Sequence, residues 1–296
     1  MADFQGIIVI HKEKGFTSHD VVAKLRGILH MKKIGHTGTL DPDATGVLPV
    51  ALGKGTKLVD LLTDKEKTYE AVLHLGIDTD TQDMSGTVLE ERPVNVTEEE
   101  VRKVLKSFVG EQLQVPPMYS ALKVNGKKLY ELAREGKTVE RKARPVCFYE
   151  IEPLEFHLPL VKIRVTCSKG TYIRTLCHDI GEKLGCGGCM EELLRSRVGR
   201  YSLSESHTLA QVEAAVADGT VQDMIDPVEA VLAEYPALYA DSYGDRLLAN
   251  GNPLSDNLVR PQHKEGWVRM YASDGTFTGI FQWDAGKKKY YPVKMF

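Results

Sequence analysis

Residues 35–48 read GHTGTLDPDATGVL, and this stretch carries the most specific pattern of the 296-residue chain. Its glycines allow close backbone approach and torsion angles that other residues disfavour. Pro42 stiffens the chain and biases Asp41 away from helical geometry. The whole segment from Met31 to Gly46 is polar and lacks a hydrophobic period, so it predicts a long loop of the kind that carries function.

The residue types of this loop leave two readings open. A carboxylate held in a rigid, glycine-lined loop can serve as a catalyst, which favours Asp41. Asp41 and Asp43 also suit the capping of turns, a common role of aspartate. Other loop chemistries do not fit. A phosphate-binding loop would need glycine at Leu48 and a hydroxyl residue at Gly55, and no HExxH, GxSxG or EF-hand pattern occurs.

Hydrophobic periodicity predicts strands and helices on both sides of the loop. The predicted strands cover residues 7–10, 69–77 and 161–167, and the predicted helices cover residues 18–30, 97–110, 173–184 and 208–217. Capping-box pairs begin the helices at Thr97 and Thr208. Gly185 ends the helix predicted over residues 173–184. The pattern predicts an α/β (α+β) fold, with a catalytic domain built on a mixed sheet over residues 1–235.

The composition changes after Tyr235-Pro236. One short helix is expected over residues 245–250, before Gly251. Short alternating segments follow over residues 267–272, 278–283 and 290–293, and Asp274-Gly275 predicts a hairpin between the first two. These features predict a small β-rich domain over residues 236–296.

The composition is that of an ordinary cytoplasmic protein, with 42% hydrophobic and 27% charged residues. No apolar run approaches the roughly 18 residues of a membrane span, and residues 1–5 do not resemble a secretion signal. Five cysteines suit a reducing compartment. Cys186 and Cys189 have the spacing of half a zinc site, but no second pair completes four ligands. We therefore expect no metal there, and a tight turn between two helices.

Basic residues gather in one segment of a chain whose net charge is −3. Residues 116–145 hold eight basic and three acidic residues, a local charge of +5. Asn125-Gly126 predicts a turn inside this segment. A basic zone on an acidic body is compatible with a polyanion bound on one face, and also with a solvated charged surface.

Taken with its flanking elements, the loop resembles the signature of the TruB-type pseudouridine synthases, which are related to the archaeal and eukaryotic dyskerin-type enzymes. In that signature the aspartate before Pro-x-Ala-Thr-Gly is catalytic, which selects Asp41 rather than Asp43. Four further blocks match in the family's order: Lys67-Thr68-Tyr69, residues 116–123 (PPMYSALK), residues 167–174 (CSKGTYIR) and Leu193-Leu194-Arg195. The similarity runs from about Gly6 to Ser202. The C-terminal part matches a PUA-like RNA-binding domain only loosely.

The resemblance implies that the chain isomerises a uridine of tRNA, at position 55 in the T-loop, without a cofactor. Such an enzyme breaks the C–N glycosidic bond, turns the base and rejoins it through carbon 5. The base must first be extruded from the folded RNA into a pocket. The implied partner is the T-arm of tRNA, with no protein partner, guide RNA or membrane, and the implied location is the cytoplasm.

The resemblance assigns the chemistry to three residues. Asp41 would act as nucleophile or as base, and both roles remain open. Arg174 would pair with Asp41 and lower its pKa. Tyr69 would stack on the target base and take a proton, although its place on the apolar face of a strand also fits a core tyrosine.

The resemblance also assigns binding roles. His36 would stack in the space left by the flipped nucleotide, although its residue type also fits a loop histidine bonded to backbone. Lys12 would support the pocket or contact phosphate, and Leu194 would contact the substrate. Residues 116–145 would form an RNA-clamping insertion that contacts the RNA backbone through Lys123, Lys127, Lys128, Arg141, Lys142 and Arg144.

One block departs from the family, because residues 11–18 read HKEKGFTS where the family has Asp-Lys-Pro-x-Gly-x-Thr-Ser. The aspartate and the proline are replaced, but the catalytic set is intact. Two alternatives remain. A non-catalytic RNA-binding or RNA-folding protein is disfavoured by the presence of Asp41, Tyr69 and Arg174 together. A guide-RNA-dependent enzyme is disfavoured by the insertion at 116–145.

Overall fold

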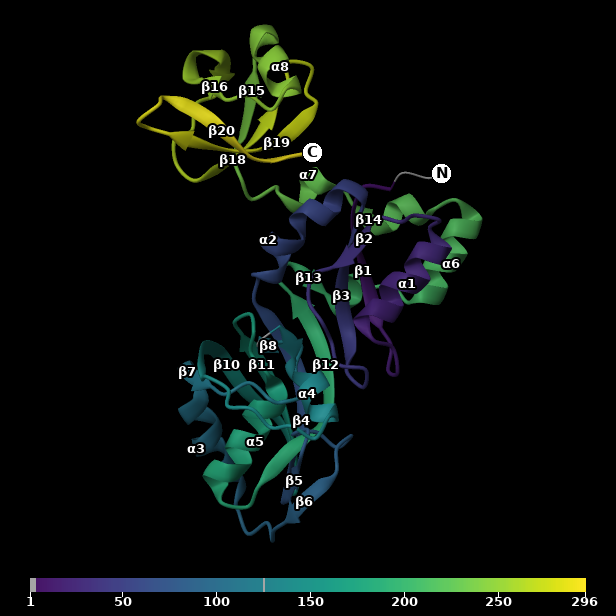
Figure 1. Cartoon of the computed structure of the whole chain (residues 1–296), viewed down its shortest axis with the longest axis vertical. Helices are drawn as coiled ribbons and strands as arrows, with labels where there is room; N and C mark the ends of the chain where they lie inside the picture. Colours follow the sequence, from purple (N-terminus) through teal and green to yellow (C-terminus); the bar gives the residue numbers. More distant parts are fainter. Residues whose placement is uncertain (1–3, 125) are drawn as a thin grey trace.

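A computed structural model of the chain describes residues 4–124 and 126–296, so Asn125 of the predicted turn lies outside the described residues. The strands in these ranges form two large sheets and two short hairpins. Figure 1 shows an elongated molecule with the second large sheet at one end and the first running through the rest. The predicted fold class, a mixed sheet with helices followed by a β-rich part, is confirmed.

The first sheet contains ten strands in the order β14-β1-β3-β12-β4-β11-β10-β7, with β2 on β3 and β13 on β12. Its strands are β1 (Gly6–Lys12), β2 (Ile34–His36), β3 (Thr45–Leu52), β4 (Lys67–Leu75), β7 (Gly110–Gln114), β10 (Arg144–His157), β11 (Leu160–Cys167), β12 (Gly188–Val198), β13 (Tyr201–Ser202) and β14 (Ile225–Asp226). Among the described strands of this sheet, only β3 and β12 pair in parallel, over two residue pairs. This short pairing joins two halves of the sheet.

The first half contains β14, β1, β3 and β2 and is covered by two helices, α1 (Ser18–Ile28) and α6 (Leu209–Asp218). A capping box of Thr17 and Asp20 begins α1, and Thr208 begins α6 in the same way. The buried faces of α1 and α6 pack together against the apolar side chains of β1 and β3.

The second half contains β12, β4, β11, β10 and β7, with α3 (Glu98–Phe108) and α5 (Ile173–Leu184) on one face. Alternate residues of β4 from Tyr69 to Leu75 are buried in the same apolar cluster as both helices. This alternation confirms the predicted strand and shows which of its faces meets the helices. A hairpin of β5 (Ile77–Thr79) and β6 (Val88–Glu91) extends from the far end of β4.

The segment between β7 and β10 leaves the sheet and returns to it at neighbouring positions, since Gln114 pairs with Arg144. It contains the hairpin β8 (Lys123–Val124) and β9 (Lys127–Lys128), followed by α4 (Leu129–Arg134). Within this segment Arg141 Nη1 donates a hydrogen bond of 3.1 Å to the carbonyl of Pro116. The arginine thereby ties the end of the segment to its start.

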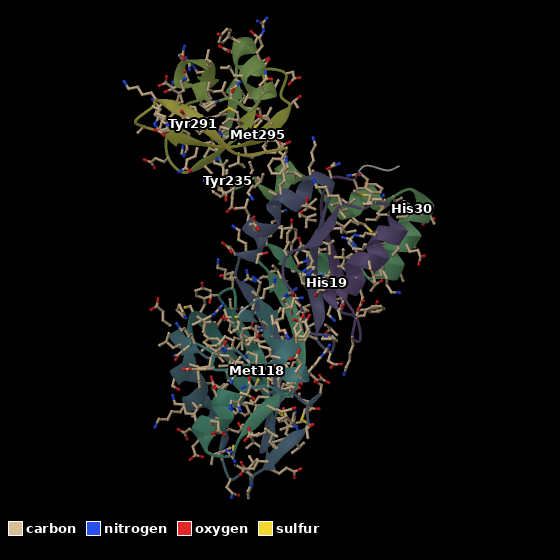
Figure 2. All side chains as sticks on the ribbon, viewed as in Figure 1. His19, His30, Met118, Tyr235, Tyr291 and Met295 are labelled. Atoms are coloured by element: carbon tan, nitrogen blue, oxygen red, sulfur yellow. The ribbon has the colours of Figure 1, made fainter. Side chains whose placement is uncertain are left out.

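The second sheet has the strand order β16-β20-β19-β18-β15-β17. Its strands are β15 (Ala237–Ala240), β16 (Leu254–Ser255), β17 (Val259–Arg260), β18 (Trp267–Tyr271), β19 (Phe277–Asp284) and β20 (Lys289–Met295), with α8 (Ser242–Ala249) beside them. Ile280 of β19 is fully buried in an apolar cluster that also contains Ile7 and Val9 of β1. Figure 2 shows Tyr235 at this junction between the sheets.

The remaining helical segments are short. They are α2 (Val59–Thr63), α7 (Val228–Val231) and the 3-10 turns Gly53–Leu58, Leu203–Glu205, Val221–Met224 and Asp256–Leu258. Every helix within residues 4–124 and 126–296 lacks the length or the apolar character that a membrane crossing requires.

Two local predictions are wrong. The segment from Met31 to Gly46 is not one continuous loop, because β2 interrupts it and β3 begins at Thr45. The turn at Cys186–Cys189 joins α5 to β12 rather than joining two helices. In both places a strand was not predicted, because three residues are too few to show alternation in β2 and register shifts break the alternation in β12.

Candidate active site

The loop between β2 and β3 lies where the two halves of the first sheet meet. β3 approaches β12 at two residue pairs, Thr45 with Leu194 and Gly46 with Arg195. Gly46 has a φ of +108°, and a Cβ there would lie 2.3 Å from the carbonyl oxygen of Arg195. Glycine is therefore required for the two strands to approach this closely. The approach brings the loop that carries Asp41 against the second half.

Lys12 of β1 supports the loop from one side. Its side chain is fully buried, and its Nζ donates hydrogen bonds to the carbonyls of Glu13 (3.1 Å), Phe16 (2.6 Å) and Pro42 (3.0 Å). Burial lowers the pKa of the Lys12 amine to about 8. Because these bonds engage the ammonium group inside the protein, Lys12 holds the backbone beside Asp41, and its contact with phosphate stays a prediction.

Arg195 of β12 supports the loop from the other side. It is 1% exposed and donates from Nε to the carbonyl of Val47 (2.8 Å), from Nη1 to that of Thr39 (3.3 Å) and from Nη2 to that of Gly38 (3.3 Å). The sequence patterns selected its neighbour Leu194, which is half-buried on the same strand. The leucine-arginine block was the available signal for Arg195, but a buried arginine bonded to backbone carbonyls was not predicted.

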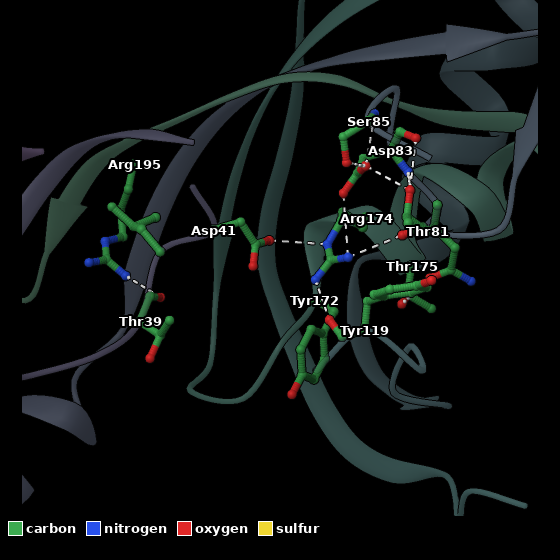
Figure 3. Close-up of polar contacts among 12 residues, drawn as sticks. Thr39, Asp41, Thr81, Asp83, Ser85, Tyr119, Tyr172, Arg174, Thr175 and Arg195 are labelled. Atoms are coloured by element: carbon green, nitrogen blue, oxygen red, sulfur yellow. Dashed lines mark hydrogen bonds and ion pairs between the residues drawn. The ribbon is translucent and has the colours of Figure 1, made fainter. Parts of the chain in front are cut away.

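Arg174 lies in the first turn of α5 and contacts Asp41, as predicted. Its Nε lies 3.1 Å from Asp41 Oδ2 (Figure 3). Nη1 donates to the carbonyl of Thr81 at 3.1 Å and lies 3.4 Å from Asp83 Oδ2, while Nη2 donates to the carbonyl of Tyr119 at 2.8 Å. The guanidinium is 5% exposed, and these contacts fix its plane and direction.

Asp83 is a second carboxylate on Arg174 that no sequence pattern indicated. It lies between β5 and β6, where its Oδ1 accepts hydrogen bonds from Thr81 Oγ1 (2.7 Å) and from the backbone N–H of Ser85 (3.1 Å). Its side chain is 15% exposed. No motif marked this residue, because aspartate is ordinary in a turn and the contact with Arg174 joins positions far apart in the chain.

The Asp41 carboxylate is open to solvent on one side, since 41% of its side chain is exposed. Its pKa is nevertheless raised, because the surrounding protein removes water from the charged form. The positive charge of Arg174 opposes this rise, and the negative charge of Asp83 adds to it. Arg174 thus lowers the Asp41 pKa, as predicted, but burial has the larger effect and the net shift of the pKa is upward.

Tyr69 of β4 lies opposite Arg195 of β12 and is 7% exposed. Burial raises the pKa of its phenol to about 12, and Arg195 opposes that rise. The negative charge of Asp41 raises the same pKa further, which places the two residues within electrostatic reach. Tyr69 also belongs to the apolar cluster under α5, so its ring packs in the core.

His36 of β2 is half-buried beside the loop. Its Nδ1 accepts a hydrogen bond of 3.3 Å from the backbone N–H of Gly38. The ring of His19 meets it edge to face, with centroids 5.3 Å apart. Burial and the charge of His19 lower the pKa of His36, so an uncharged ring is favoured. The predicted stacking of His36 and the predicted substrate contact of Leu194 stay predictions.

The basic residues of the 116–145 insertion differ in their surroundings. Lys123, Lys127, Lys142 and Arg144 are exposed, and Lys127 Nζ lies 3.2 Å from the Glu135 carboxylate. Lys128 and Arg141 are half-buried. Lys128 donates to the hydroxyl of Tyr130 at 3.1 Å, and Arg141 holds the ends of the insertion together. These two side chains are thus engaged within the insertion, and RNA contacts by all six residues stay predictions.

The cysteines at 186 and 189 are buried, and the Sγ of Cys189 contacts the sulfur of Met84 at 3.4 Å. Burial raises the pKa of the Cys189 thiol to about 12, which disfavours the thiolate that a zinc site needs. Within the described ranges, no group of three or more His, Cys, Asp or Glu side chains is arranged to hold a metal ion.

Two family models match this arrangement of residues. The model "TruB family pseudouridylate synthase (N terminal domain)" matches residues 26–173, which include Asp41 and Tyr69. The model "tRNA pseudouridylate synthase B C-terminal domain" matches residues 174–233, which begin at Arg174. Together the models cover Asp41, Asp83, Arg174 and Arg195, but not Lys12, and they end before the second sheet.

Curated relatives match over almost the whole chain. The "tRNA pseudouridine synthase B" of Lachnoclostridium phytofermentans is 52% identical, over 98% of this chain and 99% of the relative. The protein of the same name from Bacillus pumilus is 48% identical, over 93% of this chain and 92% of the relative.

Solved structures of lower identity share the fold. The chain described as "Crystal Structure of a Cbf5-Nop10-Gar1 Complex" is 29% identical with a TM-score of 0.74, over 98% of this chain and 84% of that chain. The chain described as "Structure of H/ACA RNP bound to a substrate RNA containing 2'-deoxyuridine" is 27% identical with a TM-score of 0.73, over the same shares.

Proposed function

The chain belongs to the TruB family of pseudouridylate synthases, and from this premise we propose how its residues carry out the reaction. It is an enzyme that isomerises uridine to pseudouridine in tRNA. We propose that the target is the uridine at tRNA position 55, in the T-loop, and that the chain acts in the cytoplasm. The contact of Arg174 Nε with Asp41 Oδ2, at 3.1 Å, is the observation that carries the proposal that this pair performs the isomerisation.

That contact supports a catalytic role because of the way the pair is built. Arg174 is buried and bonded on every side, whereas part of the Asp41 carboxylate is exposed. Lys12 and Arg195 fix the backbone of the loop from both sides. A reactive group that is open to solvent, on a backbone that cannot shift, is preorganised for a substrate that arrives from outside.

We propose the following course for the reaction. The target uridine leaves the folded RNA and enters the site at Asp41. The ionised carboxylate attacks the sugar carbon C1′ or removes a proton from the sugar, and the bond from C1′ to N1 of the base breaks. The uracil turns, and C1′ bonds to C5 while the bond from C1′ to Asp41 breaks or the removed proton returns to the sugar. The proton lost from C5 and the proton gained by N1 balance, so no electron acceptor is required.

Tyr69 and His36 have supporting roles in this proposal. The phenol of Tyr69, with a pKa of about 12, is protonated near neutral pH. We propose that its ring stacks on the base and that its hydroxyl relays the C5 proton, releasing one proton as it accepts another. His36, whose lowered pKa favours the neutral ring, stacks in the space that the flipped nucleotide leaves.

We propose that the 116–145 insertion clamps the RNA backbone through its exposed lysines and arginines. Lysine and arginine supply affinity for phosphates without reading sequence. No guide RNA or protein partner is required in this proposal, because the insertion supplies the grip on tRNA. The protein and RNA partners in the solved complexes are partners of the proteins in those structures.

We propose two domains, a catalytic domain over residues 1–235 and a PUA-like RNA-binding domain over residues 236–296. The strands of the two large sheets support this division, since β14 ends at Asp226 and β15 begins at Ala237. Exposed basic side chains at Lys287 and Lys288, on the turn before β20, and at Lys289, its first residue, are compatible with an RNA contact in the second domain.

We propose that the reaction uses neither a cofactor nor a metal. The proposed steps break the bond from C1′ to N1, form the bond from C1′ to C5 and transfer protons. A carboxylate supplies this chemistry. Pseudouridine formation is therefore expected to continue in excess EDTA at the rate seen without it. A loss of activity on chelation that added zinc restores would assign a metal role to Cys186 and Cys189.

Pseudouridine mapping of an unmodified tRNA transcript tests the proposed target. After treatment with the purified protein, a single new pseudouridine is expected at position 55. A transcript with cytidine at that position is the matched control and is expected to remain unmodified. Modification only at other uridines, or only after a second protein or RNA is added, would contradict the proposal.

A further inference from the structure

Gln114 is a buried polar residue at a meeting point of the fold. It is the last residue of β7, is 4% exposed and pairs across the sheet with Arg144. The insertion begins two residues later, at Pro116. A buried glutamine costs free energy unless its amide is hydrogen-bonded on both sides, so the partners of Gln114 indicate what it does.

Both ends of the Gln114 amide bond to the backbone of one residue, Tyr172. Oε1 accepts a hydrogen bond of 2.8 Å from the Tyr172 N–H, and Nε2 donates one of 3.0 Å to the Tyr172 carbonyl. Tyr172 is the N-cap of α5, and its own side chain makes no capping hydrogen bond. The side chain of Gln114 thus holds the entry to α5 as a neighbouring strand would.

Arg174 follows two residues after Tyr172, in the first turn of α5. Its guanidinium bonds to three separate segments, through the carbonyls of Thr81 and Tyr119 and the side chain of Asp41. The distance between Nε and Asp41 Oδ2 therefore depends on where the first turn of α5 lies. A displacement of about 1 Å between catalytic groups can cost about 100-fold in rate.

We propose that Gln114 is a positioning residue for the reaction, which acts through the backbone of Tyr172 to hold Arg174 against Asp41. This inference rests on the proposed catalytic roles of Asp41 and Arg174. Gln114 touches neither residue directly. Since the insertion starts at residue 116 and contacts Arg174 at the carbonyl of Tyr119, the same hydrogen bonds link the root of the RNA clamp to the catalytic pair.

The neighbouring Gln112 offers a matched control. It lies two residues earlier on the same face of β7. Its Nε2 donates to the carbonyls of Ser107 (3.3 Å) and Phe108 (3.2 Å), at the C-terminal end of α3. Gln112 therefore ties the same strand to a helix that carries no proposed catalytic residue. A general weakening of β7 would appear in variants of both glutamines.

The test compares Gln114→Leu, Gln114→Glu and Gln112→Leu with the wild-type chain. Single-turnover rates of pseudouridine formation are measured with enzyme in excess over tRNA from pH 5 to pH 8, together with tRNA affinity and thermal midpoint. Gln114→Leu removes both hydrogen bonds to Tyr172, whereas Gln114→Glu keeps the acceptor. Asp41→Asn and Arg174→Gln are assayed beside them as references.

Gln114→Leu is expected to lower the single-turnover rate about 10- to 100-fold at unchanged tRNA affinity. Its acidic limb is expected to move to higher pH, because a misplaced Arg174 opposes the raised pKa of Asp41 less well. The other charges around Asp41, from Asp83, Lys12 and Asp43, are unchanged in the variant. Gln114→Glu should fall between Gln114→Leu and wild type, and Gln112→Leu should match wild type.

A wild-type rate and acidic limb in Gln114→Leu would overturn the proposal, as would equal losses in Gln112→Leu. If Gln114→Leu does not fold, Gln114→Glu decides. A reduced rate at full tRNA affinity supports the proposal, and a wild-type rate overturns it. Retained activity in Asp41→Asn would instead refute the proposed catalytic roles, whatever Gln114 does.

Discussion

The chemical state of Asp41 depends on burial and on four charged neighbours. Burial has the largest effect and raises its pKa, Arg174 and Lys12 lower it, and Asp83 and Asp43 raise it. The carboxylate must be ionised to attack or to deprotonate. Activity is therefore expected to decline, as the pH falls, at a pH above the ordinary carboxyl value of 3.8.

Removing the charge of Arg174 is expected to move that decline further. In Arg174→Gln the pKa of Asp41 loses its main opposing influence, so the acidic limb of the single-turnover rate should shift to higher pH. The rate at the plateau should also fall, because Asp41 is less well oriented. Arg102→Gln, an exposed arginine on α3, is the control and should keep both features. An unchanged limb in Arg174→Gln would show that another group controls the acid side.

At the scale of residues, the sequence predicted the contact of Asp41 with Arg174 through two separate motifs. It did not predict that Lys12 would be fully buried, because lysine is rarely inside a protein unless every proton has an acceptor. Here the acceptors are backbone carbonyls, including that of Pro42. Every residue has a backbone carbonyl, so a sequence does not show which carbonyls accept a hydrogen bond. For the same reason the role of Arg195 was not predicted.

The insertion at 116–145 is the element whose sequence and structure point most directly to RNA. The exposed Lys123, Lys127, Lys142 and Arg144 are candidates for phosphate contacts, whereas Arg141 holds the insertion closed. Removing one cation that neutralises a phosphate lowers the salt slope of binding by about one unit. Alanine at all four exposed positions should therefore weaken tRNA binding and reduce that slope by about three to four units.

A charge-matched variant separates phosphate binding from net charge. Alanine at Arg102, Lys103, Lys106 and Lys183, which are exposed on α3 and α5, removes the same four charges away from the insertion. Binding measured between low and moderate salt should show the reduced slope only for the insertion variant. Equal slopes in the two variants would mean that the insertion is a solvated charged surface.

At the scale of elements, helices were easier to predict than strands. Thr17, Thr97 and Thr208 begin α1, α3 and α6 with capping boxes, which are local signals. β12 was missed because register shifts between Met190 and Glu192, and between Arg195 and Arg197, break its alternation. Those irregularities lie on the strand that holds the catalytic loop.

The two large sheets are joined through a shared apolar cluster. Ile280 of the second sheet is fully buried among side chains of the first, with Trp267 and Phe296 packed around it. We expect the two parts to unfold together. Both tryptophans, Trp267 and Trp283, lie in the second sheet, so tryptophan fluorescence reports that part while circular dichroism reports the whole chain.

In urea, the two signals of the wild-type chain should change at the same concentration. Ile280→Ala should cost about 2–5 kcal/mol in unfolding free energy, and the fluorescence transition should then come first, because the second sheet loses its attachment. Val268→Ala, within the core of the second sheet alone, is the control for simple destabilisation. Coincident transitions in Ile280→Ala would contradict a stabilising role for the junction.

At the scale of the whole molecule, a domain boundary near residue 235 stays a proposal, but the β-rich character of the C-terminal part was visible in the sequence. The meeting of the two halves of the first sheet was not. It rests on two residue pairs of parallel strands, β3 and β12, that lie far apart in the chain. Pairings of such long range have no local signature, yet this junction sets Asp41 opposite Arg174.

Asp41 is the residue to which the reaction is assigned. Asp43, two residues later in the same loop, provides the control for that assignment. Asp41→Asn is nearly isosteric and should fold as well as wild type. Because the pKa of Asp41 is raised in the folded chain, its stabilising contribution is present only at low pH and is lost as the pH rises through that pKa. Removing the charge should therefore not reduce the free energy of unfolding at neutral pH.

The most direct test measures pseudouridine at tRNA position 55 after a single turnover, with Asp41→Asn, Asp43→Asn and wild-type enzyme each saturating the tRNA. We predict no detectable product with Asp41→Asn, tRNA binding equal to that of wild type, and product formation by Asp43→Asn. Product formation by Asp41→Asn together with an inactive Asp43→Asn would contradict the assignment of the reaction to Asp41.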